Sequence, residues 1–290
     1  MIKTVITVIF RARARGESMT TLQELLREQH LTKYSEAALP RVSIIVPTYN
    51  CAQSISSTLD SLLDQNYQNL EIIAIDADSV DRTLELLEGY TDPRLRIYSV
   101  SSYNRYEMFN KGISLAQGEY LNFLFPGDFY VRPDTLRIMM TMALDQTKPQ
   151  LVYSGTLLRD GRSEVKVMFR QLSLDLLKQG QQPTSLQACW FRRDIFAEIG
   201  KFRTDISLRG GFDLMCRFCL NEKLRFNALH YALTDYDLRW VTHQRVFSHF
   251  TETFKIVYSH FGFFATVAWL WKQKDISRFF KLWLRSLKGR

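Results

Sequence analysis

The stretch Val42-Ser-Ile-Ile-Val-Pro-Thr-Tyr-Asn50 decides the fold of this 290-residue chain. The apolar, β-branched run Val42–Val46 predicts a strand covered on both faces, because such a strand has no polar face to alternate with. Pro47 lacks the N–H that a sheet ladder needs, so we expect the strand to end there and open into a polar loop. Apolar residues at helical spacing then predict a helix over Ser54–Leu63.

Strands and helices continue to alternate after this unit. The sequence predicts strands at Glu71–Asp76, Leu95–Val100, Tyr120–Phe125 and Leu151–Leu158, and helices at Thr83–Leu87 and Asp134–Leu144. Such alternation implies right-handed crossovers, an α/β fold and a mostly parallel central sheet flanked by helices.

Polar loops follow three of the predicted strands. They are Pro47–Asn50, Asp76–Asp81 and Phe125–Phe129. Parallel sheets bind ligands at the carboxyl ends of their strands, so we expect these loops to meet in one crevice.

Composition excludes several classes of protein. A hydrophobic share of 46% with 23% charged residues is ordinary for a folded protein and argues against disorder. Four scattered cysteines are too few for a disulfide framework, which favours a reducing, cytoplasmic setting. Cys216 and Cys219 have the spacing of half a zinc site, but no second pair completes it, so we expect buried thiols.

The net charge of +8 is concentrated at the C-terminus, where residues 272–290 contain seven basic residues and one acidic residue. Apolar residues in this tail recur at helical spacing, namely Ile276, Phe279, Phe280, Trp283, Leu284 and Leu287. A basic amphipathic helix can dock on its own domain or lie on an anionic membrane surface, and the local charge favours the membrane. A nucleic-acid binder would spread its charge over a domain face, so no nucleic-acid partner is expected. These features predict a cytoplasmic protein, peripheral at the inner face of the plasma membrane.

The N-terminal extension, residues 1–40, begins with the apolar run Met1–Phe10, which basic residues follow rather than precede. A secretory signal has the opposite order, so none is predicted. Met1 and Met19 both remain candidate starts.

Four ordered blocks resemble family 2 of the inverting glycosyltransferases, which have the GT-A fold. They are Val42–Asn50, Leu70–Thr83, Tyr106–Asp128 and Gln187–Phe202. The resemblance implies a GT-A-like domain over residues 41–235. The residues after it, 236–290, form the predicted C-terminal helical extension, which ends in the basic amphipathic stretch. Four blocks in order are more specific than any one of them.

The resemblance also implies an activity. The enzyme would move a sugar, with inversion, from a nucleoside-diphosphate sugar to a hydroxyl of a glycan or lipid-linked acceptor, in assembly of a bacterial surface polysaccharide. A divalent cation, Mg²⁺ or Mn²⁺, would neutralise the diphosphate leaving group. The donor-binding residues implied are Pro47, Tyr49, Asn50, Asp76, Asp78, Lys111 and Asp128, with Asp128 also the metal ligand and Asp213 the catalytic base.

Several family carboxylates are replaced in this chain. Ala77 stands where a carboxylate often contacts the nucleobase, Phe125-Pro-Gly127 replaces the Asp-x-Asp motif before Asp128, and Gly211 occupies the place of the base. These replacements keep open an alternative, a non-catalytic GT-A-fold protein that binds a glycan or a partner transferase. Asp76, Asp78 and Asp81 equally fit helix capping, and Asp128 fits an ordinary loop carboxylate.

Overall fold

The computed structural model describes residues 34–145, 148–159, 166–238 and 243–272. The apolar segment at Met1–Phe10 and the predicted basic helix after residue 272 lie outside these residues.

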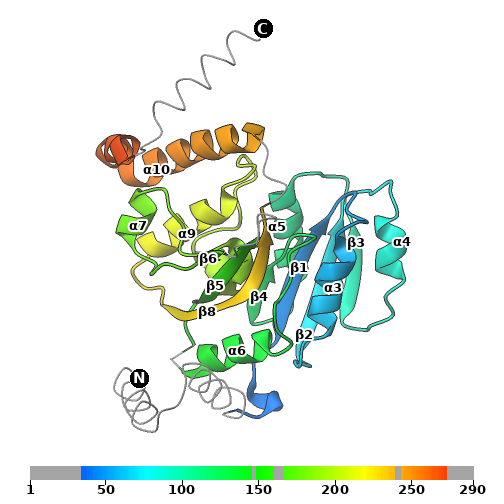
Figure 1. Ribbon diagram of the computed structural model, residues 1–290. Helices are drawn as coiled ribbons and strands as arrows, with labels where there is room; N and C mark the ends of the chain where they lie inside the picture. The colour runs from blue at the N-terminus through cyan, green and yellow to red at the C-terminus, as the bar shows by residue number, and fades with distance from the viewer. Residues whose placement is uncertain (1–33, 146–147, 160–165, 239–242, 273–290) are drawn as a thin grey trace.

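The N-terminal half of the sheet is parallel, as predicted. Its strands are β1 (Val42–Thr48), β2 (Leu70–Asp76), β3 (Leu95–Ser99) and β4 (Tyr120–Phe123), in the order β3-β2-β1-β4 (Figure 1). After β1, β2 and β3 come the helices α3 (Ile55–Leu63), α4 (Thr83–Glu88) and α5 (Arg105–Leu115), and the short 3-10 turn η1 (Glu36–Ala38) precedes β1. Every residue of β1 and β2 is buried, as their unbroken apolar runs predicted.

Strand β1 continues through Pro47, where we expected it to end. Val42 donates its N–H toward β2, to Asn69 O, so odd-numbered residues of β1 direct their N–H toward β4. The β1–β4 ladder ends at Ile45 and Phe123, so Pro47 has no neighbour on that side to which it must donate. The strand therefore tolerates this proline and stays paired with β2 up to Thr48.

The second half of the sheet is mixed. Strands β7 (Cys189–Arg192), β5 (Leu151–Arg159) and β6 (Lys166–Met168) extend it by antiparallel pairs, and β8 (Phe226–Asp237) pairs in parallel with β5. Four of the seven strand pairings in the described residues are parallel, which confirms the mostly parallel sheet. The remaining elements of this half are α6 (Thr135–Asp145), α7 (Leu174–Lys178), the 3-10 turn η2 (Leu186–Ala188), α8 (Ile195–Glu198) and α9 (Gly210–Leu220).

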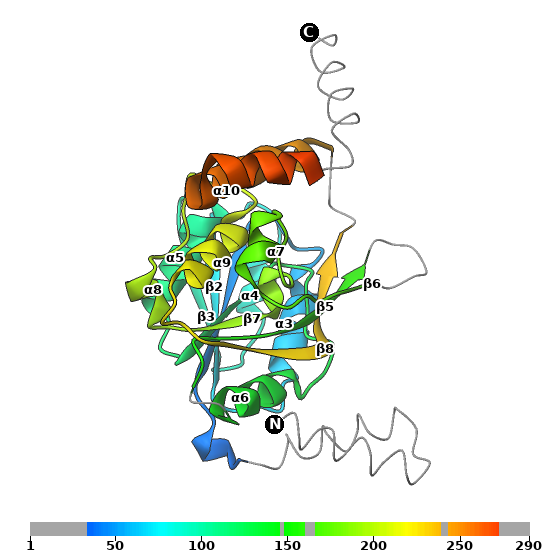
Figure 2. The same cartoon turned by 90° about the vertical axis from the view of Figure 1, so that its left-hand side faces the viewer.

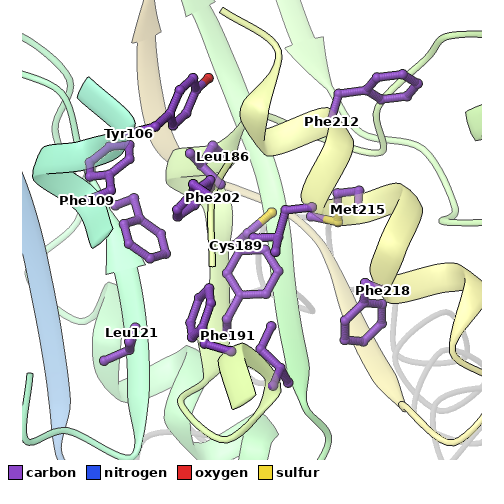
Figure 3. Packing of buried hydrophobic residues seen from close by; sticks show 14 of the residues in the cluster. Tyr106, Phe109, Leu121, Leu186, Cys189, Phe191, Phe202, Phe212, Met215 and Phe218 are labelled. Atoms are coloured by element: carbon purple, nitrogen blue, oxygen red, sulfur yellow. The ribbon is translucent and has the colours of Figure 1, made fainter. Parts of the chain in front are cut away.

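Each face of the sheet carries its own apolar core. Neighbouring residues of β1 point to opposite faces, so Ile45 belongs to one cluster and Ile44 to the other. The cluster of Ile45 is rich in aromatic rings, and Figure 3 shows Phe109 of α5, Phe191 of β7 and Phe218 of α9 within it. Coverage of both faces leaves the strand ends as the place for a ligand.

The long helix α10 (His243–Lys272) lies beside α7 and α9, at the end of the molecule opposite α6 (Figures 1 and 2). It is kinked at Gly262, whose φ of 77° is in the left-handed region. Ile256, Val257 and Trp269 are buried in the core. The described part of the C-terminal extension thus packs on the domain, and the predicted boundary after residue 235 falls inside β8. Among the helices described, none combines the length and apolarity required to cross a bilayer.

Candidate active site

A cavity of about 650 Å³ opens where the sheet's central strands end. It brings together the loop after β1, Asp81 from the loop after β2, the loop after β4 and the end of β8. Its lining residues are Pro47, Tyr49, Asn50, Cys51, Gln53, Ser54, Asp81, Tyr103, Arg105, Met108, Phe125, Pro126, Asp128, Tyr236 and Asp237. The three loops that the sequence selected therefore converge, as the strand-end rule predicts.

Two exposed tyrosines lie on one side of this cavity. Tyr49 and Tyr103 are 46% and 64% exposed, and their ring centroids are 4.6 Å apart. Asn50 lies beside them in the left-handed region, with φ of 45°. Its side chain accepts from Val80 N at 2.9 Å and its N–H donates to Ser79 Oγ at 3.0 Å, so it fixes the β1 loop to the β2 loop. Aromatic faces of this kind can hold a planar base.

Asp76 and Asp78, two of the predicted donor-binding residues, do not line the cavity. Asp76 is buried and accepts from Thr48 Oγ1 at 2.9 Å, Ser79 N at 2.9 Å and Ser79 Oγ at 2.7 Å. It therefore holds two loops in place, while Asp78 is an exposed turn residue with φ of 50°. The carboxylate that this loop presents to the cavity is Asp81, which also accepts from Thr83 N and Ala52 N.

Asp128 lies in the cavity and is almost fully buried, with 4% of its surface exposed. Burial raises its pKa to about 7, and the nearby charges of Asp235 and Asp237 act in the same direction. Hydrogen bonds from Gln187 Nε2 and Asp237 N oppose this shift without cancelling it. Because Asp235 and Asp237 lie close to Asp128, a cation placed next to these three side chains would be stabilised.

Arg159 supplies part of that charge. Its guanidinium pairs with Asp235 at 2.7 Å and with Asp237 at 3.4 Å. Asp128 and Asp237 both line the cavity and offer the oxygen ligands that Mg²⁺ and Mn²⁺ prefer. No group of three or more acidic, histidine or cysteine side chains is arranged for a metal within the described ranges, so a cation would need further ligands from its substrate.

The cation that reaches the cavity is Arg105, not Lys111. Lys111 is exposed on α5 and absent from the lining. Arg105, at the start of α5, extends over the ring of Phe125 at 5.2 Å from the centroid. Helical spacing decides this difference, because six residues rotate a side chain by about 240° around the axis.

Asp213, the predicted base, lies outside the cavity. Its side chain is completely buried and accepts from Arg217 Nε at 2.9 Å and pairs with His260 Nε2 at 2.8 Å. Burial by itself raises the pKa of Asp213, but the hydrogen bond from His260 and the charge of Arg217 hold that pKa below its usual value. The structure therefore places Asp213 as a buried carboxylate that joins α9 to α10 and lines neither this cavity nor the one that adjoins it.

A second cavity, of about 480 Å³, adjoins the first and shares Arg105, Phe125 and Tyr236 with it. Its other lining residues come from the segments around β6 and η2 and from α9, β8 and α10. They are Tyr106, Met168, Arg170, Gly180, Gln181, Gln182, Ser185, Leu186, Gln187, Leu208, Arg209, Gly211, Leu238, Val246 and His249. Tyr106, Leu186 and Phe212 show where α5, η2 and α9 approach one another (Figure 3).

Sequence comparison decides the family. The family model for glycosyl transferase family 2 matches residues 43–200, more than half of the chain. The chain belongs to this family.

Similar glycosyltransferases support this membership. A PGL/p-HBAD biosynthesis glycosyltransferase of Mycobacterium tuberculosis is 28% identical over 203 residues, 69% of this chain and 78% of that protein. Chondroitin synthase of Pasteurella multocida is 27% identical over 202 residues, but these make up only 21% of its length.

Solved structures agree on the GT-A fold. Staphylococcus aureus TarS in complex with UDP-GlcNAc superposes with a TM-score of 0.62 at 20% identity, covering 76% of this chain and 66% of that one. The mannosyltransferase PcManGT from Pyrobaculum calidifontis, in complex with GDP-Man and Mn²⁺, gives a TM-score of 0.57 at 18% identity, covering 92% and 84%. The predicted GT-A-like α/β fold is thereby confirmed.

Sequence reasoning missed several residues of the two cavities. Tyr103, Tyr236 and Asp237 carry no motif that marks them. Arg209 precedes Gly210 and Gly211 of α9, and no local pattern in the sequence predicts that it is buried. The pairing of β8 with β5 brings Tyr236 and Asp237 to the site, α9 and α10 enclose Arg209, and Tyr103 reaches the site from the loop between β3 and α5.

Proposed function

We propose that this glycosyltransferase moves a sugar from a nucleoside-diphosphate donor to a hydroxyl of a glycan or lipid-linked acceptor, with inversion. The observation that supports it is the pair of adjoining cavities that share Arg105, Phe125 and Tyr236. A donor in the first cavity and an acceptor in the second would meet at these residues. Direct attack by the acceptor on the face opposite the leaving group inverts the anomeric carbon.

On the donor side, Tyr49 and Tyr103 would stack on the base, and Arg105 would contact phosphate. Asp128 and Asp237 would hold a divalent cation that takes its remaining ligands from the diphosphate and water. Such a cation supplies charge neutralisation of the leaving group. The raised pKa of Asp128 fits this role, because a neighbouring cation stabilises its ionised form.

On the acceptor side, Gly211 occupies the place of the family's base and no carboxylate lines the second cavity among the described residues. His249 does line it. Burial and the positive charge of Arg209 lower the pKa of His249 to about 4, so its imidazole is neutral at pH 7. A lowered pKa makes this imidazole a weak base, so His249 would accept a hydrogen bond that orients the acceptor hydroxyl.

A panel of nucleotide sugars tests the proposal. With Mn²⁺ or Mg²⁺ present, one donor at about 100 times its dissociation constant should raise the melting temperature by roughly 5 °C and be slowly hydrolysed. Tyr49→Ala should lose this response, because it removes a stacking ring. Tyr258→Ala, a similarly exposed tyrosine on α10, is the matched control and should keep it. No response to any donor would favour the non-catalytic alternative.

We also propose that residues 272–290 bring the enzyme to an anionic membrane. Phe263, Phe264 and Trp271 in the last part of α10 are 64%, 87% and 83% exposed, and they immediately precede this basic segment. Removal of residues 272–290 is expected to shift the protein from pellet to supernatant when it is sedimented with phosphatidylglycerol vesicles. Phosphatidylcholine vesicles are the control, and an unchanged distribution would contradict this role.

A further inference from the structure

Arg209 is a buried cation that has no acidic partner among the residues the structure describes. Only 6% of its surface is exposed, and its guanidinium lies 4.1 Å from the centroid of the Phe212 ring. Its two terminal nitrogens donate to neutral acceptors, Gln182 Oε1 at 2.5 Å and Gly180 O at 2.7 Å. Its Nε has no hydrogen-bond partner in the described ranges. Burial lowers the pKa of Arg209 to about 10, so it remains charged at neutral pH.

An unpaired buried charge is costly, so proteins normally satisfy it with a counter-ion. Glu252 is the carboxylate whose charge acts on the pKa of Arg209. Its two carboxylate oxygens accept from backbone N–H groups of Ser207, Leu208 and Arg209, at 2.8 to 2.9 Å. The guanidinium of Arg209 therefore faces the second cavity without a carboxylate bound to it.

The rest of that cavity has the same sign of charge. Arg170 and Arg105 also line it, and neither forms an ion pair with any residue in the described ranges. No aspartate or glutamate of the described part of the chain lines it. Gly211, in the first turn of α9, adds the positive end of a helix dipole. Three guanidiniums with no lining carboxylate make this cavity selective for negative charge.

We propose that the second cavity binds an anionic group carried by the acceptor, a phosphate or a carboxylate, with Arg209 as its buried anchor. Arg170 would contact the same group from the exposed side, and Arg105 would face the junction with the donor cavity. Guanidinium forks match both anions by paired hydrogen bonds. This inference rests on the proposed function only in assigning the second cavity to the acceptor.

The test gives Arg209 the carboxylate partner that it lacks. Gln182→Glu replaces the amide oxygen that accepts from Arg209 with a carboxylate oxygen of the same shape, so it should keep the fold and neutralise the anchor. Gln117→Glu is the matched control, since Gln117 also accepts from an arginine, Arg41, and lines neither cavity. Arg170→Gln is a second variant, on an exposed side chain.

Binding is measured by calorimetry on the full chain without donor. The probes are p-nitrophenyl glucoside, its 6-phosphate and p-nitrophenyl glucuronide. The wild type should bind at least one anionic probe tenfold or more tightly than the neutral glucoside. The anionic probe that binds more tightly shows whether the cavity prefers a phosphate or a carboxylate. Gln182→Glu should remove this preference and Arg170→Gln should reduce it about threefold, while Gln117→Glu leaves it unchanged.

Three outcomes would overturn the inference. Equal affinity for all three probes, or binding of neither anionic probe, would show that the cavity does not select an anion. A loss of UDP and GDP affinity in Gln182→Glu as large as the loss of anion affinity would assign the cavity to the donor diphosphate. A different result separates this inference from the proposed function. If no nucleotide sugar binds but the preference for an anionic probe persists, the proposed transferase activity is contradicted and the anion-binding cavity is supported.

Discussion

Asp128→Asn is expected to lower sugar transfer by about 10²- to 10³-fold, the effect of removing one preorganised group at a charged reaction centre. Asparagine has the same shape and can accept the hydrogen bond from Asp237 N, so the loop should keep its conformation. It lacks the charge needed to hold a divalent cation against the diphosphate. The measurement is kcat/KM with the donor that the panel identifies, and unchanged transfer would make Asp128 an ordinary loop carboxylate.

The same variant should be more stable than the wild type in alkaline, metal-free buffer. The folded-state pKa of Asp128 is about 7, against about 3.9 in an unfolded chain. Folded protein therefore retains a proton that unfolded protein has released, and stability falls as pH rises from about 4 through 7. At pH 8 the wild type should have lost about 2 to 4 kcal/mol of unfolding free energy by this route.

Urea unfolding in EDTA at pH 5 and pH 8 measures this difference. Asp128→Asn should gain relative to the wild type at pH 8 and little at pH 5. Asp78→Asn is the control, because Asp78 is exposed and lines neither cavity. Parallel pH dependence in all three proteins would contradict the raised pKa of Asp128.

Asp213→Asn is expected to destabilise the fold by about 3 to 5 kcal/mol, the usual cost of breaking a buried ion pair by removing one partner. Arg217 and His260 would face an uncharged amide inside the protein, with side chains only 18% and 16% exposed. Arg217 also donates to Gly200 O and Lys201 O, so the change should loosen the loop before α9. Transfer by the protein that remains folded should change by less than about threefold, since only groups near the reacting atoms act on them directly.

This variant separates the structural role of Asp213 from the role that the family resemblance implied. If Asp213 were the base, Asp213→Asn would keep its melting temperature and lose transfer. Asp175→Asn is the control, because Asp175 pairs with Lys178 at the surface, away from Asp213, where ion pairs contribute about 1 kcal/mol or less.

The parallel half of the fold could be predicted from the sequence because its signals are local. The buried run at Val42–Val46 needs both faces covered, and the predicted loops lie where β1, β2 and β4 end, at Thr48, Asp76 and Phe123. In a parallel sheet such loops must meet at one edge, so convergence required no knowledge of distant contacts. Asp128 could be selected in this way, and it does lie in the cavity.

The mixed half of the sheet and most of the acceptor side depended on tertiary structure. Strand β8 has mixed burial along its length and no clear period, so nothing local predicted that Tyr236 and Asp237 reach the site. Asp76 has the right position in sequence, but hydrogen bonds within the loops hold its carboxylate away from the cavity. Asp78 is exposed, with φ of 50°, and lines neither cavity.

The sequence by itself determined the order of strands and helices in the parallel half, the loops at the sheet edge and the resemblance to the family, because periodicity and turn chemistry act between near neighbours. Tertiary structure alone decided that Asp213 pairs with Arg217 and His260, that Arg209 is buried without a carboxylate, and that the pKa of Asp128 is raised. Burial and charge environment are set by segments far apart in the chain, so no reading of local residues contains them.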